Sequence, residues 1–203
     1  MVEITIDLLR HGDVADGKKL LGHTDEALTE LGWQQLRSVI DGKQPPWTSV
    51  VTSPLQRCHA FSEELSSQFN LPLSIEPRFK EISFGEWDGQ LLSELYNGEH
   101  ADKMMKFWQN PAEHSAPEGE HYHDFERRVM TAWQALLDSL TTETSHHCLL
   151  VTHGGVIRAI LRNLLGFPTD NFFRIAVPYG CLSRIKIYQN PATPSLIFHG
   201  GTL

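Results

Sequence analysis

Two histidines follow two short apolar segments of the sequence. Arg10-His11-Gly12 comes directly after residues 4–9, and His153 comes after residues 148–152 and before two glycines. Such segments, rich in leucine or β-branched residues and closed by glycine, are typical of buried strands in a parallel sheet. Ligands of open α/β sheets bind at the carboxyl ends of the strands, where an imidazole nucleophile and a guanidinium could meet an anion. Either histidine alone could equally be an ordinary polar residue at a strand end, but the pair indicates a site.

The elements that would position these residues alternate between strands and helices. Further strands are expected at 49–52, 73–75, 182–188 and 195–198, the last as an edge hairpin. Helices are expected after Thr29 as N-cap, from Ser53-Pro54 with Arg57 in the first turn, over 124–140 and over 157–164. We therefore predict an α/β fold, a three-layer αβα sandwich around a mostly parallel central sheet with an antiparallel edge strand.

The length of the chain indicates one domain. At 203 residues it is too short for two ordinary α/β domains, so we expect a single domain over 1–203. Residues 81–125 interrupt the regular alternation with glycines, prolines and two short helical patterns, at 91–96 and 102–108. We interpret this segment as an irregular insertion over the site.

The charge and the cysteine content exclude several classes of protein. A net charge of −8 would repel nucleic acid and anionic membranes, so neither is expected as a partner, and a bound anion must rely on local positive charge. No segment reads as a membrane span or a signal peptide, and the three cysteines are not spaced for a disulfide framework. These features predict a cytoplasmic protein and leave a homodimer open.

Four segments of the chain carry motifs in a fixed order. They are LRHGD at 9–13, SPLQRC at 53–58, EISFGEWDG at 81–89 and THGG at 152–155. In this order and placement the chain resembles the histidine phosphatase superfamily, also called the phosphoglycerate mutase-like family, over positions 4 to about 188. The resemblance implies the fold of that family and a phosphoric monoester hydrolase that forms a phosphohistidine intermediate on a small-molecule phosphomonoester.

The chemistry of phosphate gives the main candidates their roles. A phosphomonoester is doubly anionic near neutral pH, and Arg10 and Arg57 would supply two guanidinium forks for its oxygens. His11, neutral and held through its other ring nitrogen by a backbone acceptor, would attack phosphorus. His153 would be protonated or donate one hydrogen bond, and so stabilise charge in the transition state.

Five further residues are expected to bind the substrate. Gly12 and Gly154 would allow the backbone to approach the ligand closely. Leu21, Gly22 and His23 match, by resemblance, a loop that lies beside the ligand in relatives.

The leaving alkoxide needs a proton donor, an acid with a raised pKa near the rim of the pocket. By resemblance this donor is Glu81, which opens the pattern Glu-x-x-x-Gly-x-Trp-x-Gly. Taken alone, Glu81 would be interpreted as a solvated loop carboxylate. Asp13, directly after the Arg-His-Gly triplet, is the rival donor, although its partner could be an arginine rather than the substrate.

The sequence departs from the family at one place. Relatives often carry a phosphate-contacting asparagine a few residues after the triplet, where this chain has Ala-Asp-Gly-Lys at 15–18. Lys18 or Lys19 could replace that contact electrostatically, although a lysine in such a loop is usually solvated.

The other chemistry-bearing residues are expected to be structural. His121 with His123, and His146 with His147, have no third ligand at a suitable interval, so we predict solvated histidines, no metal site and no cofactor. Cys58 is interpreted as a packed residue, because no histidine partner is indicated by its spacing. A final set of aromatic residues would either pack in the core or form a wall for a ring-bearing leaving group: Phe84, Trp87, Phe107, Trp108 and Tyr179.

The compactness of the chain favours hydrolysis over mutase activity, since mutases of the family are usually longer. Among compact members, residues 20–25, 84–89, 117–120 and 180–183 look most like bacterial α-ribazole phosphatases. Those enzymes remove the 5′-phosphate of α-ribazole phosphate in cobalamin nucleotide-loop assembly. A broad-specificity or sugar-phosphate phosphatase with the same core, and a non-catalytic phosphate-binding relative, remain as alternatives.

Overall fold

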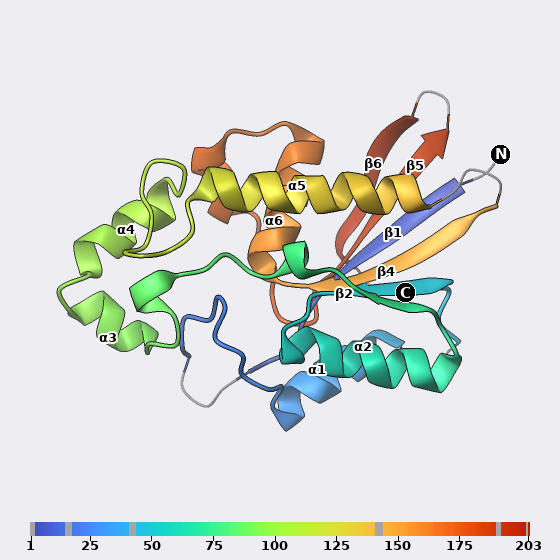
Figure 1. The fold of residues 1–203 in the computed structure, drawn as a ribbon, viewed down its shortest axis with the longest axis horizontal. Helices are drawn as coiled ribbons and strands as arrows, with labels where there is room; N and C mark the ends of the chain where they lie inside the picture. The colour runs from blue at the N-terminus through green and yellow to red at the C-terminus, as the bar shows by residue number, and fades with distance from the viewer. Residues whose placement is uncertain (1–2, 15–17, 41–43, 141–143, 190–191, 202) are drawn as a thin grey trace.

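A six-stranded mixed sheet forms the middle of the molecule (Figure 1). The computed structural model describes residues 3–14, 18–40, 44–140, 144–189, 192–201 and 203. The strands are β1 (Glu3–Arg10), β2 (Ser49–Thr52), β3 (Leu73–Ile75), β4 (His146–Thr152), β5 (Leu182–Gln189) and β6 (Ala192–Gly201). They lie in the order β3-β2-β4-β1-β5-β6. The first four are parallel, whereas β5 is antiparallel to β1, and β6 to β5.

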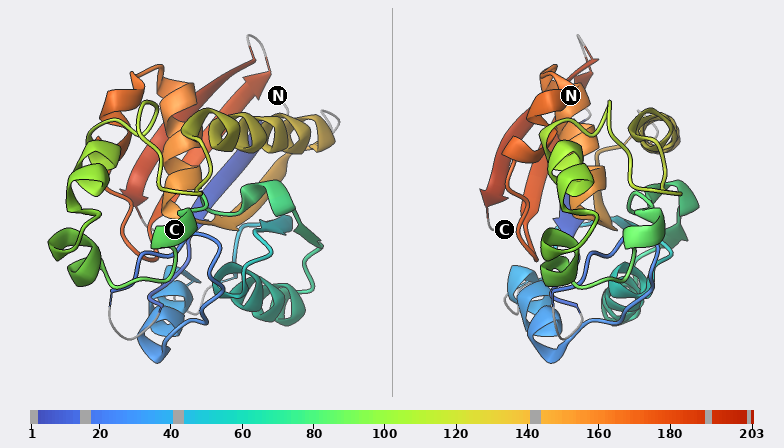
Figure 2. Two further views of the ribbon diagram at one scale, coloured as in Figure 1. Left: turned by 60° about the vertical axis from the view of Figure 1, so that its left-hand side comes forward. Right: turned by 90° about the vertical axis from the view of Figure 1, so that its left-hand side faces the viewer.

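Helices cover both faces of this sheet. On one face lie α1 (Glu30–Ile40) and α2 (Gln56–Phe69), and on the other α5 (Tyr122–Ser139) and α6 (Gly154–Leu165) (Figures 1 and 2). Two short helices, α3 (Leu92–Asn97) and α4 (Ala101–Gln109), lie beyond the carboxyl end of β1 (Figure 1). The remaining elements are the 3₁₀ turns η1 (Pro77–Phe79), η2 (Gly85–Trp87) and η3 (Thr169–Arg174). The predicted α/β fold is confirmed, with a mostly parallel central sheet and an antiparallel edge formed by β5 and β6.

The core divides into two layers because neighbouring residues of a strand face opposite sides of the sheet. Leu8 and Leu150 are fully buried in the cluster that includes residues of α5 and α6. Leu9 and Val151, each one position further along, are fully buried in the cluster with residues of α1 and α2. Burial on both faces explains why the sequences of β1 and β4 are almost continuously apolar.

The starts of α1 and α2 differ in how well the sequence predicts them. The hydroxyl oxygen of Thr29 accepts a hydrogen bond from the Gly32 amide at 3.0 Å, so Thr29 caps α1 as predicted. The predicted start of α2 at Ser53-Pro54 is wrong by two or three residues, because α2 begins at Gln56. The Ser53 amide still donates to the sheet, to the Val151 carbonyl at 3.0 Å, which delays the turn into the helix.

One carboxylate interrupts the apolar face that β1 turns toward α1 and α2. Asp7 is fully buried and accepts hydrogen bonds from Trp47 at 2.8 Å, His147 at 2.9 Å and Arg184 at 2.8 Å. Burial alone would raise the pKa of Asp7, but these donors, Arg184 first, hold it below its ordinary value. The prediction that His147 is solvated is therefore wrong, since it is part of this buried network.

Candidate active site

His11 and His153 lie side by side because the strands that carry them are neighbours. In the parallel register of β1 and β4, Arg10 pairs with Thr152, so the residues that follow these two meet at one edge of the sheet. The ring centroids of the two histidines are 5.2 Å apart. The pairing expected from the two strand ends is thus present in the structure.

His11 is held in one tautomer. Its Nδ1 lies 2.8 Å from the Gly12 carbonyl oxygen, and because a carbonyl only accepts, Nδ1 donates and Nε2 keeps its lone pair. Burial lowers the pKa of His11 well below its ordinary value, and the charges of Arg10 and Arg57 add to the shift. His11 is only 4% exposed but lines a cavity, so it offers a neutral nucleophilic nitrogen to a ligand.

His153 is buried more deeply than His11 and lies outside the residues that line the cavity. Burial lowers its pKa well below the ordinary value, with further contributions from Arg57 and His11. This shift favours the neutral, hydrogen-bonding ring over the protonated one, the two states expected from the sequence. Its Nε2 lies 2.7 Å from the hydroxyl oxygen of Ser53.

Cys58 contacts the second histidine. Its Sγ lies 3.7 Å from Nε2 of His153, a neighbour that the spacing in sequence did not indicate, and the complete burial of Cys58 confirms the prediction of a packed residue. Burial raises the pKa of the thiol, which keeps it protonated. Cys58 therefore packs against His153 as a neutral group.

Three arginines approach the site, and backbone carbonyls hold each of them. Arg10 donates to the Val177 carbonyl at 2.5 Å and stacks over Tyr179, with its Cζ 4.2 Å from the ring centroid. Arg158 donates through Nε to the Ile175 carbonyl at 2.9 Å. Among the described residues, neither forms an ion pair with a carboxylate, and the same holds for the third arginine, Arg57.

Arg57 is fully buried behind the loop at 22–24. Its two terminal nitrogens donate to the carbonyls of Gly22 and Thr24, both at 2.7 Å. Arg57 therefore does not line the cavity. It holds the loop at 22–24 in place and contributes positive charge to the site.

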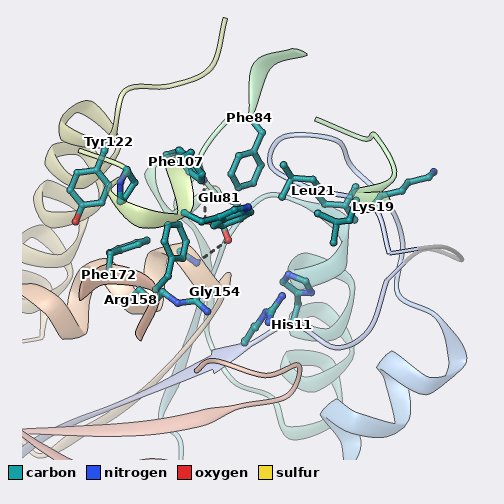
Figure 3. A pocket seen from close by; sticks show the side chains of 18 of the residues that line it. His11, Lys19, Leu21, Glu81, Phe84, Phe107, Tyr122, Gly154, Arg158 and Phe172 are labelled. Atoms are coloured by element: carbon teal, nitrogen blue, oxygen red, sulfur yellow. Dashed lines mark hydrogen bonds between the residues drawn. The ribbon is translucent and has the colours of Figure 1, made fainter. Parts of the chain in front are cut away.

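Glu81 lies between η1 and η2 in the chain, and its carboxylate packs against the first turn of α6. It is buried, and not the solvated residue that its sequence context alone would indicate. It is 8% exposed and lines the cavity. One carboxylate oxygen accepts from the Ile82 amide at 3.0 Å and the other from the Gly155 amide at 2.9 Å (Figure 3). A Cβ at Gly155 would lie 2.2 Å from the nearer oxygen, so the missing side chain makes room for the carboxylate.

The rival acid, Asp13, lies outside the residues that line the cavity. Its carboxylate accepts a hydrogen bond from the hydroxyl of Thr29 at 2.8 Å, so its partner is a threonine rather than an arginine. This geometry favours Glu81 over Asp13 as the acid that can reach a ligand.

The five predicted substrate-binding residues divide into two groups. Leu21 and Gly154 line the cavity. Gly12 instead packs on α1, because a Cβ there would lie 2.1 Å from the Gly32 carbonyl oxygen. Gly22 and His23 do not line the cavity: Gly22 is buried and His23 is exposed.

The loop at 22–24 is held from its other side by a second charged residue. The Asp88 carboxylate accepts the amides of Gly22 at 3.0 Å, His23 at 2.7 Å and Thr24 at 3.0 Å. Nε2 of His23 lies 3.0 Å from the Glu81 carbonyl, so His23 positions the backbone of Glu81.

The loop in which the sequence departs from the family is described only in part. Residues 15–17 lie outside the described residues, so the replacement of the asparagine there has no structural account. Lys18 is exposed. Lys19 lines the cavity, but its ammonium forms an ion pair with Glu26 at 2.8 Å.

The cavity has a volume of about 200 Å³ and two unlike ends (Figure 3). One end presents His11, Gly154, Arg10 and Arg158, and Glu81 lies between the two ends. The other end is aromatic and is lined by Phe84, Phe107, Trp108, Tyr122, Phe172 and Phe173. Of the predicted wall, Phe84, Phe107, Trp108 and Tyr179 line the cavity, whereas Trp87 is fully buried outside it.

Sequence reasoning missed Arg158 and three of the aromatic lining residues, Tyr122, Phe172 and Phe173. Arg158 had a usable signal, because it lies four residues after Gly154 in a predicted helix and therefore on the same face. Tyr122, Phe172 and Phe173 had no such signal, since they belong to segments that meet the site only in the folded chain.

Comparison with known proteins agrees with this geometry. Residues 6–197 match the family described as histidine phosphatase superfamily (branch 1). The chain belongs to the histidine phosphatase superfamily. This assignment confirms the resemblance inferred from the four motifs.

Among its relatives in the superfamily is the adenosylcobalamin/alpha-ribazole phosphatase of Escherichia coli strain K12. It is 30% identical over 194 residues, covering 92% of this chain and 91% of that one. The glucosyl-3-phosphoglycerate phosphatase of Mycolicibacterium vanbaalenii is 28% identical over 174 residues, covering 81% and 76%. The solved structure of the alpha-ribazole phosphatase from Shigella flexneri superposes with a TM-score of 0.79 at 27% identity, covering 97% and 96%.

Membrane-spanning helices and metal-binding clusters are both missing from the described part of the chain. None of the helices in the described ranges is long and apolar enough to cross a membrane. Within the same ranges, histidine, cysteine and acidic residues form no group of three or more that could hold a metal ion.

Proposed function

We propose that this histidine phosphatase superfamily member is a phosphomonoesterase that transfers the phosphoryl group to His11 and then to water, with α-ribazole 5′-phosphate as its substrate. One observation carries the proposal. A neutral histidine with a free Nε2 stands beside guanidinium groups that form no ion pair with any described carboxylate. A dianionic phosphoryl group would supply the missing negative charge at the point toward which the nucleophile is aimed.

In the first half of the reaction, Nε2 of His11 attacks phosphorus in line with the leaving oxygen. The N–P bond forms while the P–O bond to the leaving group breaks. Arg10 binds the phosphoryl oxygens, and Arg57 and His153 stabilise the transition state from behind the cavity. Glu81, when protonated, delivers its proton to the leaving oxygen, which departs as an alcohol.

In the second half, the Glu81 carboxylate takes a proton from a water molecule as that water attacks the phosphohistidine. The N–P bond breaks, inorganic phosphate forms and His11 returns to its neutral state. One carboxyl group thus serves as acid and then as base, which suits its place between the two ends of the cavity.

The aromatic end supports the choice of substrate. A nucleoside such as α-ribazole carries a flat ring system, and aromatic side chains at the cavity wall suit such a ring. The relatives from Escherichia coli and Shigella flexneri named as α-ribazole phosphatases support the same substrate. A sugar-phosphate phosphatase is the second candidate, supported by the relative named as a glucosyl-3-phosphoglycerate phosphatase.

The phosphatase activity is tested by phosphate release from 4-nitrophenyl phosphate. We expect the parent to be active and His11→Ala to lose activity by about 10⁴-fold or more. A radiolabelled phosphoenzyme trapped during turnover should be acid-labile, as a phosphohistidine is. An inactive parent, or a His11→Ala variant as active as the parent, would refute the proposal.

The substrate is tested by comparing kcat/KM for α-ribazole 5′-phosphate with the values for sugar phosphates and phosphoglycerates. A clear preference for α-ribazole 5′-phosphate is expected. Equal values would leave a phosphatase of broad specificity, and a preference for a sugar phosphate would favour the second candidate.

A further inference from the structure

Arg158 and Arg10 are held as a pair by one short segment of the chain. The Ile175 carbonyl accepts from Arg158 and the Val177 carbonyl accepts from Arg10. These two carbonyls are two residues apart in the non-helical stretch between η3 and β5. The same segment therefore fixes both guanidinium groups at one wall of the cavity.

The two guanidinium groups meet over Gly154. A Cβ built on Gly154 would lie 3.1 Å from Nη1 of Arg158 and 3.5 Å from Nε of Arg10. Both arginines and Gly154 line the cavity, and Figure 3 shows Arg158 extending past Gly154 on the side of His11. The absence of a side chain at Gly154 leaves this point free.

Two positive charges this close are unfavourable unless an anion joins them. Burial lowers the pKa of Arg158, and among the surrounding charges Glu81 opposes this shift most while Arg10 adds to it. Within the described ranges, neither guanidinium forms an ion pair with a carboxylate.

An orphaned donor supplies a second observation. Nε of Arg10 is buried and has no hydrogen-bond partner among the described residues. Buried donors without a partner are costly and rare in native proteins. A ligand oxygen placed between Arg10 and Arg158 would satisfy this donor and compensate both charges.

We propose that Arg158 is a phosphoryl-binding residue, which together with Arg10 holds the oxygens of the transferred group during attack by His11. This inference rests on the proposed function, because it assigns a further residue to the same reaction. Arg158 acts on the phosphoryl group itself and not on the leaving group. Its loss should therefore lower kcat/KM for all substrates by similar factors, whatever alcohol they release.

The chain offers a matched control on the same helix. Arg162 lies one turn beyond Arg158 in α6, and its guanidinium is paired with Glu126 at 2.6 Å, outside the cavity. Arg158→Met keeps an apolar stem and removes the charge, and Arg162→Met makes the same change one turn away. Arg158→Lys keeps a positive charge and guards against a folding defect in the first variant.

The experiment measures binding of inorganic phosphate by calorimetry, together with kcat/KM for 4-nitrophenyl phosphate and for an alkyl phosphate. We expect Arg158→Met to weaken phosphate binding by about tenfold or more and to lower kcat/KM for both substrates by similar factors. Arg158→Lys should recover part of the loss, and Arg162→Met should behave as the parent does. Thermal unfolding of each variant checks that it is folded.

Two results would overturn the inference. One is phosphate affinity and kcat/KM in folded Arg158→Met and Arg158→Lys equal to the parent values. The other is a loss confined to the alkyl phosphate, which would mean that Arg158 acts through the proton on Glu81. If the parent turns over no phosphomonoester but binds phosphate in an Arg158-dependent way, the proposed function fails and the anion site stands.

Discussion

The two ends of the cavity are built in different ways. The phosphoryl end takes Arg10 and His11 from the end of β1, and His153 lies beside His11 at the end of β4, so the hydrogen bonds of the sheet fix their relative positions. The aromatic end takes its side chains from η3 and from the segment that contains α4, whose positions depend on packing between side chains. Phe107 and Phe173, for example, meet at a centroid distance of 5.6 Å.

This difference separates reaction from specificity. Groups at the ends of paired strands move little, which suits an in-line displacement that needs positions accurate to a fraction of an ångström. Residues on loops and short helices can change without disturbing the sheet. We therefore expect substitutions at the phosphoryl end to affect all substrates, and substitutions at the aromatic end to affect the ranking of substrates.

Glu81→Gln changes the residue that lies between the two ends of the cavity. Among the substitutions that compare the two ends, it has the largest expected effect on activity. It should slow alkyl phosphates by about 10²–10⁴-fold, because their alkoxide must be protonated as it leaves. Aryl phosphates, whose leaving groups are stable anions, should be slowed far less. Measuring kcat/KM across a series of leaving groups checks this, and equal slowing of the whole series would argue for another proton donor.

The pH dependence of stability should reside in the phosphoryl end. Burial lowers the pKa of His11 and of His153 in the folded state, so an unfolded chain binds more protons than the folded one below about pH 6.5. Stability is then lost as the pH falls through this value, by up to about 1.4 kcal/mol per pH unit for each histidine.

Denaturant unfolding of the parent and of His153→Gln at about pH 7.5 and pH 5.5 measures this loss. The variant should lose less stability between the two pH values than the parent. Trp108→Leu, at the aromatic end, should lose as much as the parent. Identical losses in the parent and His153→Gln would show that His153 does not titrate in this way.

Trp108→Leu tests the aromatic end. Trp108 is half-buried, lines the cavity and packs on Phe173 at a centroid distance of 4.6 Å. We expect KM for a nucleoside phosphate to rise by about tenfold, which corresponds to about 1.4 kcal/mol of lost contact with the ring. The affinity for inorganic phosphate should not change, and a parallel loss of both would mean that the two ends are not separable.

Gly155→Ala has the smallest expected effect and tests the placement of Glu81. An added Cβ would overlap a carboxylate oxygen of Glu81, at 2.2 Å, and push it away from the cavity. We expect alkyl phosphates to be slowed by about fivefold, the effect of losing about 1 kcal/mol from one hydrogen bond. In the Glu81→Gln background the same substitution should add little further, and full additivity would contradict the link between the two residues.

Much of the phosphoryl end could be predicted from the sequence because its signals are local. A short apolar run followed by Arg-His-Gly or His-Gly-Gly identifies a strand end, and parallel pairing brings such ends together. Arg158 could have been added on the same basis, from its helical spacing to Gly154.

The remaining features depend on contacts between residues far apart in the chain. Gly12 is a glycine because of the Gly32 carbonyl on α1, and not because of a ligand. Cys58 meets His153 across 95 positions, and the spacing of the two in sequence says nothing of it. Phe172 and Phe173 come close to Phe107 and Trp108 only when the chain folds. The sequence alone therefore could not show whether these aromatic residues line a cavity or fill the core.

The loop at 22–24 lies between two opposite charges that do not touch each other. Arg57 donates to the carbonyls of Gly22 and Thr24, and Asp88 accepts from the amides of the same two residues. One peptide group, between Gly22 and His23, contacts both charges: its carbonyl accepts from Arg57 and its N–H donates to Asp88, so its negative end faces Arg57 and its positive end faces Asp88. Arg57 and Asp88 thus stabilise each other through one polarised peptide group, as an ion pair with a piece of backbone in place of direct contact.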